Sequence, residues 1–394
     1  MSRATPSSLR PDARPPLWVD DAVGLRDLAK CMESCEAIAI DTEGNSLHAY
    51  RERLCLLQIS AGGDDWLVDT TVDLDLSVLG PALANPAICK VFHDAEYDVL
   101  TLKRASQLRI AGIFDTKVAA CSLGIEGVGL AAMLERFFGV LLDKGQQLSD
   151  WGRRPLTSHQ VEYARRDTHW LLELAWELQA LLREREELHE LEVRSECRRL
   201  ESLMPVARPD PNEGWRKLPI ATRIDARTRT ALARLWRMRE ELAEARDVPV
   251  FKILDTPTLV ALARARPRDR TSLSAVAGLS DSLKARHGES ILRALAAGPD
   301  SRDSESSDDR GFTDPEEALG PKAQRVLKAL RRWRKDVADR RRTDLSLVLP
   351  KATMLALCQL DPAPRSVEQL EDTGLLETWR VARYGSEILQ ALKS

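Results

Sequence analysis

The chain has 394 residues, 43% of them hydrophobic and 30% charged, which is ordinary for a globular protein and enough for two or three domains. No stretch approaches the roughly 18 apolar residues of a membrane span, and residues 1–16 are polar and proline-rich. We therefore expect neither a membrane segment nor a secretory signal, and a cytoplasmic protein. The seven cysteines lack metal-ligand spacing, which favours reduced, packed thiols.

The net charge of -3 hides an asymmetry along the chain. Residues 1–214 carry 24 Lys and Arg against 35 Asp and Glu, whereas residues 215–297 carry 17 against 9. Residues 298–317 carry 2 against 8, and residues 318–394 carry 15 against 9. A solvated surface would explain each excess alone, but two basic modules following an acidic one favour a polyanionic partner.

The N-terminal half predicts an α/β domain with a mixed central sheet. Residues 1–16 are expected to be a disordered tail, and Asp20 or Asp21 to cap a helix that runs to about Glu33. Turn-like breaks after the first two apolar runs favour neighbouring antiparallel strands, and helical patterns alternate with the later runs. The predicted strands are residues 36–41, 54–59, 66–68, 88–92 and 109–114.

A long helix is predicted to start at Thr157. Thr157 and Gln160 have the spacing of a capping box, and Leu156 and Val161 have that of a hydrophobic staple. Apolar residues then recur at helical spacing as far as Leu181. The charged run over residues 183–190 is interpreted as a solvated face of this helix.

The C-terminal half contains an internal repeat, separated from the first domain by a proline-rich linker over residues 204–214. It predicts two copies of one small helical module, residues 215–297 and 318–394. Their connector, residues 298–317, is rich in Ser and Asp and is expected to be flexible. At a constant offset of 95, the matches include Arg239 with Arg334, Leu242 with Val337, Thr258 with Thr353, and Ala261-Leu262 with Ala356-Leu357.

Four carboxylates and a tyrosine form the chemically informative set. Asp41 and Glu43 lie two apart at a strand end, so their side chains share a face, although solvated edge residues often show this pattern. Tyr163 and Asp167 lie four apart and share a helix face. Asp98 follows a predicted strand, where a helix starts. An all-oxygen set suits Mg²⁺ or Mn²⁺ rather than zinc, and a pair of such ions serves in-line displacement at phosphorus.

This order, D-x-E, then D, then Y-x-x-x-D, resembles the DEDD 3′–5′ exonucleases with tyrosine in the last motif. Residues 50–59 and 129–156 are similar to the ribonuclease D family, and the resemblance covers residues 17–203. Residues 236–258 resemble an HRDC domain, whereas the second copy is degenerate at residues 345–350. The implied fold is a ribonuclease H-like exonuclease domain followed by two small all-α HRDC domains.

The resemblance also implies roles for the five motif residues, none of which departs from the family pattern. Asp41 would bridge two divalent metal ions, Mg²⁺ or Mn²⁺. Glu43 and Asp167 would hold the ion that activates water, Asp98 would support the ion at the leaving oxygen, and Tyr163 would orient the water. The implied activity is trimming of single-stranded 3′ tails of tRNA precursors and other small structured RNAs to nucleoside 5′-monophosphates. Nothing in the sequence demands more than a monomer.

Five further residues are candidates for substrate contacts. His93 lies near Asp98 in sequence, but a hydrogen-bonded structural histidine explains it at least as well. Lys144 and Gln147 lie in a glycine-containing loop that either covers the site or simply connects two elements. Arg165 and Arg166 either meet phosphates or offset the nearby carboxylates.

Two other functions stay open at this point. A DNA 3′–5′ exonuclease would use the same carboxylates, although the chain shows no helicase or polymerase motif. An inactive RNA-binding adaptor would be expected to have lost a carboxylate, and all four are present.

Overall fold

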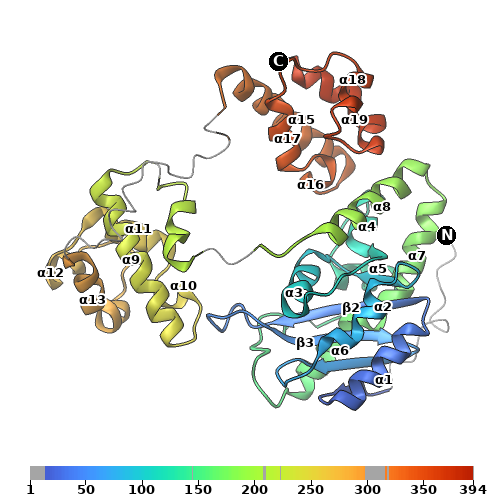
Figure 1. The fold of residues 1–394 in the computed structure, drawn as a ribbon, viewed down its shortest axis with the longest axis horizontal. Helices are drawn as coiled ribbons and strands as arrows, with labels where there is room; N and C mark the ends of the chain where they lie inside the picture. The colour runs from blue at the N-terminus through green and yellow to red at the C-terminus, as the bar shows by residue number, and fades with distance from the viewer. Residues whose placement is uncertain are drawn as a thin grey trace. The chain divides into compact units, whose positions relative to one another are not determined.

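The computed structural model describes residues 14–143, 145–206, 210–221, 223–297, 316 and 319–393. Most of the tail expected over residues 1–16 and of the linker expected over residues 298–317 lies outside these ranges. The chain divides into two compact units (Figure 1). Unit 1 comprises Met1–Gly44, Arg53–Pro205 and Leu319–Ser394, and unit 2 comprises Asn45–Glu52 and Val206–Ala318. Within the described residues, no helix is both long and apolar enough to cross a membrane.

Unit 1 is built on a six-stranded sheet in the order β1-β4-β3-β2-β5-β6. Strand β3 runs antiparallel to β2 and β4, while β1, β5 and β6 join as parallel neighbours, which confirms the predicted mixed sheet. The predicted strand over 109–114 is shorter than expected, and β1 was not predicted. The strands are β1 (Leu17–Val19), β2 (Ala37–Gly44), β3 (Leu54–Ala61), β4 (Asp64–Asp69), β5 (Cys89–Phe92) and β6 (Ile113–Asp115).

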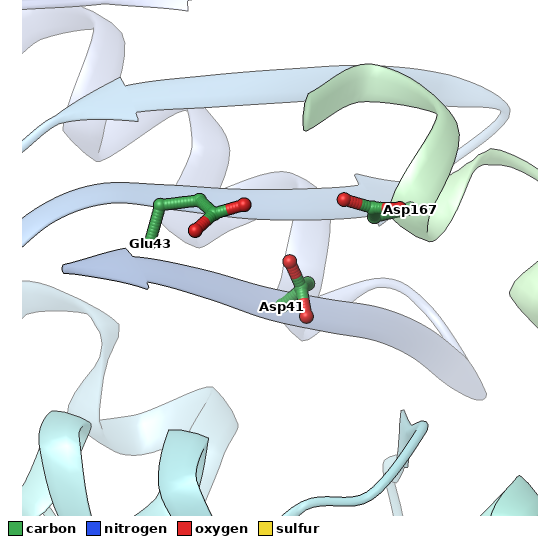
Figure 2. A group of neighbouring side chains, drawn as sticks. All are labelled: Asp41, Glu43 and Asp167. Atoms are coloured by element: carbon green, nitrogen blue, oxygen red, sulfur yellow. The ribbon is translucent and has the colours of Figure 1, made fainter. Parts of the chain in front are cut away.

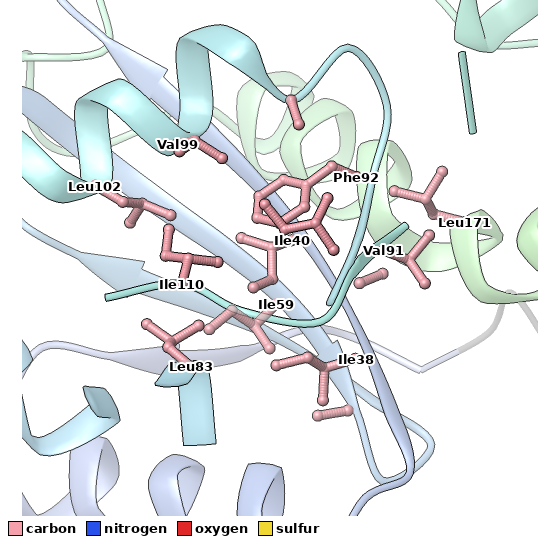
Figure 3. Packing of buried hydrophobic residues seen from close by; sticks show 14 of the residues in the cluster. Ile38, Ile40, Ile59, Leu83, Val91, Phe92, Val99, Leu102, Ile110 and Leu171 are labelled. Carbon is pink, nitrogen blue, oxygen red and sulfur yellow. The ribbon is translucent and has the colours of Figure 1, made fainter. Parts of the chain in front are cut away.

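Helices cover both faces of this sheet. Isoleucines of β2 and β3 point into the main hydrophobic core together with Phe92 of β5 and with residues of α3 and α7 (Figure 3). On the opposite face, Leu56 of β3 packs with Ala164 of α6 and with Trp151. The helices of this part are α1 (Ala22–Glu33), α2 (Gly80–Ala84), α3 (Glu96–Ser106), α4 (Thr116–Ser122), α5 (Leu130–Phe138), α6 (Ser158–His169), α7 (Leu171–Arg183) and α8 (Glu187–Ser202).

The helix predicted from Thr157 starts as expected but does not continue as one rod. Thr157 and Gln160 form both hydrogen bonds of the capping box. Trp170 then leaves the helical conformation, with φ -107° and ψ 8°, and separates α6 from α7. The charged residues of the run 183–190 are exposed as expected, but they do not lie on one helix, because the run contains the end of α7 and the start of α8. The break lets α6 cover the sheet while α7 turns into the core.

The rest of unit 1 is a helical module whose last long helix packs on α8. Arg380 of α19 pairs with Glu196 of α8 at 2.6 Å, with exposed side-chain fractions of 1% and 3%. Arg341 of α15 makes two hydrogen bonds to Glu192, at 3.0 and 2.7 Å. The helices of the module are α15 (Pro321–Arg341), α16 (Leu345–Val348), α17 (Lys351–Cys358), α18 (Val367–Asp372) and α19 (Thr378–Leu392).

Unit 2 contains the first copy of the same module and confirms the repeat. Its helices α9 to α13 match α15 to α19 in order. The segment Asn45–Glu52 also belongs to this unit, where the Tyr50 hydroxyl donates to Glu240 at 3.0 Å. The elements are the 3₁₀ helix η3 (Pro211–Lys217), α9 (Ala226–Ala245), α10 (Val250–Ile253), α11 (Thr256–Ala265), α12 (Arg270–Ser274) and α13 (Asp281–Ala296).

Candidate active site

Three of the predicted carboxylates converge where β2 passes under α6. Asp41 and Glu43 project from the same face of β2, and Asp167 reaches them from α6 (Figure 2). One oxygen from each carboxylate lies within 4.8 Å of the others. All three residues are half-buried, so a small ligand can approach them from solvent. The structure therefore brings together residues that are more than 120 positions apart in the sequence.

Asp98 completes the acidic group from the first turn of α3. It is only 5% exposed, and one of its oxygens accepts a 2.5 Å hydrogen bond from the Thr42 hydroxyl. Because Thr42 lies between Asp41 and Glu43 on β2, this bond fixes α3 against the strand that carries the other two carboxylates. Asp98 is near enough for its charge to affect Glu43 and Asp167.

Tyr163 lies one helical turn before Asp167 and packs on the Trp151 ring, with 5.9 Å between the ring centroids. It lines a small cavity of about 130 Å³ together with Asp167 and Arg166. Burial, followed by the charges of Asp167, Glu43 and Asp41, raises the pKa of its hydroxyl. The tyrosine therefore stays protonated at neutral pH and can donate a hydrogen bond into this cavity.

The four carboxylates repel one another. Burial raises the pKa of Asp41 to about 7. Burial and the charges of Asp41, Asp167 and Asp98 raise the pKa of Glu43 to about 10. The pKa values of Asp98 and Asp167 are also raised well above the usual range, through burial and then the charge of Asp41. Placing several carboxylates in one recess disfavours their ionised forms unless a cation joins them.

The donor set fits a hard divalent cation. It consists of carboxylate oxygens, the ligands that Mg²⁺ and Mn²⁺ prefer, and none of the four carboxylates forms an ion pair with a described Lys, Arg or His. Gln58 of β3 lies directly across from Asp41, is fully buried, and has no hydrogen-bond partner for either polar atom of its amide. Buried polar groups rarely lack partners. An unsatisfied amide beside unneutralised carboxylates is consistent with a site that takes up a cation with its water.

Of the five residues predicted to contact substrate, the structure places only some beside the carboxylates. Arg166 lines the cavity beside Tyr163, but Arg165 is 2% exposed and pairs with Glu162 and Asp65, so it offsets carboxylates rather than facing the site. His93 is hydrogen-bonded to Thr116 at 2.8 Å, as expected of a histidine with a structural role. Gln147 is exposed outside the residues lining the cavity, and Lys144 lies outside the described residues.

Three residues near the site were not predicted. Asp143 and His159 line the cavity with Tyr163, and no spacing in the sequence relates Asp143 to α6. Gln58 did carry a signal, because it is a polar residue within the otherwise apolar run of β3. A polar residue inside a fully buried strand indicates a specific partner.

Comparison with known proteins agrees with this arrangement. A 3′–5′ exonuclease domain family matches residues 16–183, and the HRDC domain family matches residues 229–295 and 323–392. A ribonuclease D of Pseudomonas paraeruginosa is 27% identical over 96% of this chain and 97% of its own length. A ribonuclease D of Gluconacetobacter diazotrophicus is 30% identical over 90% and 87%.

Other relatives share less of the chain or only the fold. The exosome complex exonuclease RRP6 of Saccharomyces cerevisiae is 31% identical over 64% of this chain, which spans only 36% of that relative. The crystal structure of Escherichia coli RNase D superimposes with a TM-score of 0.68 over 96% of this chain and 99% of its own, at 23% identity.

The sheet, the carboxylate arrangement and the full-length matches lead to one assignment. The structure combines a mixed-sheet nuclease domain with two helical modules, and two ribonuclease D relatives align with 90% and 96% of the chain. The chain belongs to the ribonuclease D family of 3′–5′ exoribonucleases.

Proposed function

We propose that Asp41, Glu43, Asp98, Asp167 and Tyr163 form the hydrolytic centre, working with two divalent cations, Mg²⁺ or Mn²⁺. The observation that carries the proposal is the convergence of Asp41, Glu43 and Asp167, with the charge of Asp98 nearby, without a described counter-cation. Bound divalent cations would lower the pKa of the attacking water and stabilise charge on the departing 3′ oxygen.

The protein's own groups have separate tasks in this proposal. Asp41, Glu43 and Asp167 would hold the cations, because their carboxylates meet where β2 and α6 come together. The Thr42 hydroxyl keeps the Asp98 carboxylate oriented. The protonated Tyr163 hydroxyl donates to the attacking water and orients it towards the phosphorus. Arg166 lines the same cavity, paired with Glu162 at 2.5 Å, and would supply a positive charge near a bound phosphate.

The proposed substrates are RNAs with single-stranded 3′ ends, among them tRNA precursors and other small structured RNAs, which are shortened to nucleoside 5′-monophosphates. The ribonuclease D relatives that match most of the chain support RNA over DNA. A cytoplasmic location and a monomeric state stay predictions.

The deciding experiment is a time course with a 5′-labelled RNA that has a single-stranded 3′ tail, in Mg²⁺, resolved on a denaturing gel beside its DNA counterpart. A ladder that shortens from the 3′ end, and forms much faster on RNA, is expected. Faster cleavage of DNA would instead favour the DNA exonuclease, and no cleavage of either substrate would favour the inactive adaptor.

Single substitutions test whether cleavage depends on these residues. Asp41→Asn and Asp167→Asn each remove a proposed cation ligand and are expected to abolish cleavage while RNA binding persists. Asp27→Asn, on the exposed face of α1, removes the same charge away from the site and is expected to leave the rate unchanged. Tyr163→Phe is expected to lower kcat by about 10²-fold, because the water loses its orientation. Full activity of Asp41→Asn would exclude this site.

A further inference from the structure

Gln58 is a buried polar residue whose side chain the protein does not satisfy. It belongs to β3, a strand that is buried along its whole length, and its side chain is fully buried. Neither the nitrogen nor the oxygen of its amide has a hydrogen-bond partner among the described residues. Burial of such an amide is unfavourable, because its hydrogen bonds to water are lost and not replaced. The amide therefore does not help the metal-free protein to fold.

A second polar residue of β3 shows that the fold can satisfy a polar group at a comparable place. Ser60 lies two positions further along the strand, and therefore on the same face of the sheet as Gln58. It is also fully buried, but its hydroxyl lies 2.6 Å from a carboxylate oxygen of Asp65 and 2.9 Å from the Thr168 hydroxyl. Gln58 differs from Ser60 in having no such partner.

The position of Gln58 connects it with the carboxylate cluster. Strand β3 runs antiparallel to β2, and Gln58 stands directly opposite Asp41 in the register. Residues paired in this way have Cβ atoms about 4.5–5.5 Å apart on one face of the sheet, so the Gln58 amide can reach the Asp41 carboxylate. Helix α6 packs over the same face, where Leu56 lies against Ala164. The amide is therefore enclosed beside the strand that carries Asp41 and beneath the helix that carries Asp167.

We propose that Gln58 is a positioning residue for Asp41. When the Asp41 carboxylate binds a cation, the amide N–H group of Gln58 donates a hydrogen bond to it and holds it in its ligating direction. Groups that hydrogen-bond to metal ligands in this way commonly change metal affinity by about 10- to 100-fold. This role rests on the proposed cation centre, and it adds to that centre a residue that does not itself touch the cation.

The test replaces the amide by an apolar group of similar size in the full chain. Gln58→Met removes the two unpaired polar atoms, so the urea midpoint of unfolding in EDTA should shift to higher urea. The same variant should weaken Mg²⁺ binding about tenfold, measured from the rise of the melting temperature with Mg²⁺ concentration. Gln58→Leu should give the same two changes. A purely structural residue would not make the metal-free protein more stable and its cation affinity lower when it is replaced.

Ser60→Ala is the matched control, because it also replaces a buried polar residue on the same face of β3. It removes a hydroxyl that already has partners, so the urea midpoint in EDTA should fall. Its Mg²⁺ affinity should stay within about twofold of wild type, because its partners are not among the proposed ligands. If Gln58→Met lowered the urea midpoint as Ser60→Ala does, or left the Mg²⁺ affinity unchanged, the proposal would be overturned.

The Mg²⁺ dependence of RNA cleavage separates positioning from a direct part in the reaction. Gln58→Met should need about ten times more Mg²⁺ for half-maximal cleavage, and its rate at saturating Mg²⁺ should recover to the wild-type value. A rate that stays low at every Mg²⁺ concentration would overturn the positioning role. If the melting temperature of the wild-type protein did not respond to Mg²⁺, the cation centre itself would fail. A normal response of the wild type with an equal response of Gln58→Met would remove only the role of Gln58.

Discussion

Unit 1 contains two groups of buried or half-buried acidic residues that are neutralised in different ways. On α8, Glu192 and Glu196 are 0% and 3% exposed, and arginines of the second module pair with both. At the end of β2, Asp41 and Glu43 lie beside Asp167 with no described cationic side chain paired to them. One group joins two parts of the protein, and the other is left for a cation from solution.

The two groups differ in whether the protein itself neutralises the buried negative charge. Buried carboxylates are tolerated only when something offsets their charge. Where arginines do so, the cluster is complete within the chain. Where the pKa values of the carboxylates rise instead, as at Asp41 and Glu43, the protein alone does not stabilise the ionised state. The same acid-to-amide substitution should therefore have opposite effects on stability in the two clusters.

The largest effect on stability is expected for the buried ion pair between α8 and α19. Glu196→Gln removes the buried carboxylate that pairs with Arg380 and leaves its guanidinium only the more exposed Glu377 as an anionic partner, which should lower the free energy of unfolding by about 3 kcal/mol. The double variant Glu196→Met/Arg380→Met removes both charges and should recover most of this loss. Urea denaturation in EDTA measures both variants. A double variant as unstable as the single one would contradict a pair-specific effect.

A smaller effect of opposite sign is expected in the carboxylate cluster at the end of β2. Asp41→Asn removes one of the repelling charges and should raise the free energy of unfolding of the metal-free protein by about 1–3 kcal/mol at pH 8. The measurement is again urea denaturation in EDTA. If Asp41→Asn destabilised the protein as Glu196→Gln does, the two clusters would be of the same kind.

The pH dependence follows from the raised pKa values. Between about pH 4 and pH 7, the folded protein holds protons on Asp41 that the unfolded chain has lost, so stability in EDTA should fall as pH rises through this window. Glu43 extends the fall to higher pH. Mg²⁺ at about 100 times its dissociation constant should restore about 2.7 kcal/mol. The melting temperature should therefore rise with Mg²⁺ at pH 8 and much less at pH 5, and an equal rise at both pH values would contradict this explanation.

The smallest effect is expected for an exposed ion pair between the loop after α4 and the end of α15. Arg342 and Glu126 lie 2.7 Å apart, but their side chains are 63% and 62% exposed. Glu126→Gln should change stability by less than about 1 kcal/mol, because solvent screens exposed pairs. It is thus a matched control for Glu196→Gln. A loss as large as that of Glu196→Gln would show that burial is not what distinguishes the two pairs.

Local patterns in the sequence predicted much of the fold. Asp21 caps α1 as one of the two expected residues, and the Thr157 capping box forms. The antiparallel run from β2 to β4 followed from apolar stretches separated by turn signals. Each of these features depends on residues close together in the chain.

The missed features depend on distant residues. Strand β1 has three residues and no periodicity of its own, and it exists because β4 offers an edge. Arg165 turns away from the site because Asp65, a hundred positions earlier, lies beneath it. No glycine or proline marks the break at Trp170 in the sequence. The break reflects packing of α7 in the core. The proximity of the five motif residues was predictable because two short spacings and a familiar order mark them.

The capped start of α6 restricts where the chain can tolerate an inserted residue. Tyr163 and Asp167 are the sixth and tenth residues after the cap at Thr157, which fixes where the first turn begins. Because each helical residue turns by about 100°, one inserted codon between positions 158 and 162 would swing both side chains away from Asp41 and Glu43. An insertion among residues 145–150, before the cap, would only lengthen a loop. Gaps between this protein and its relatives should therefore fall on the N-terminal side of Thr157, and not within the helix.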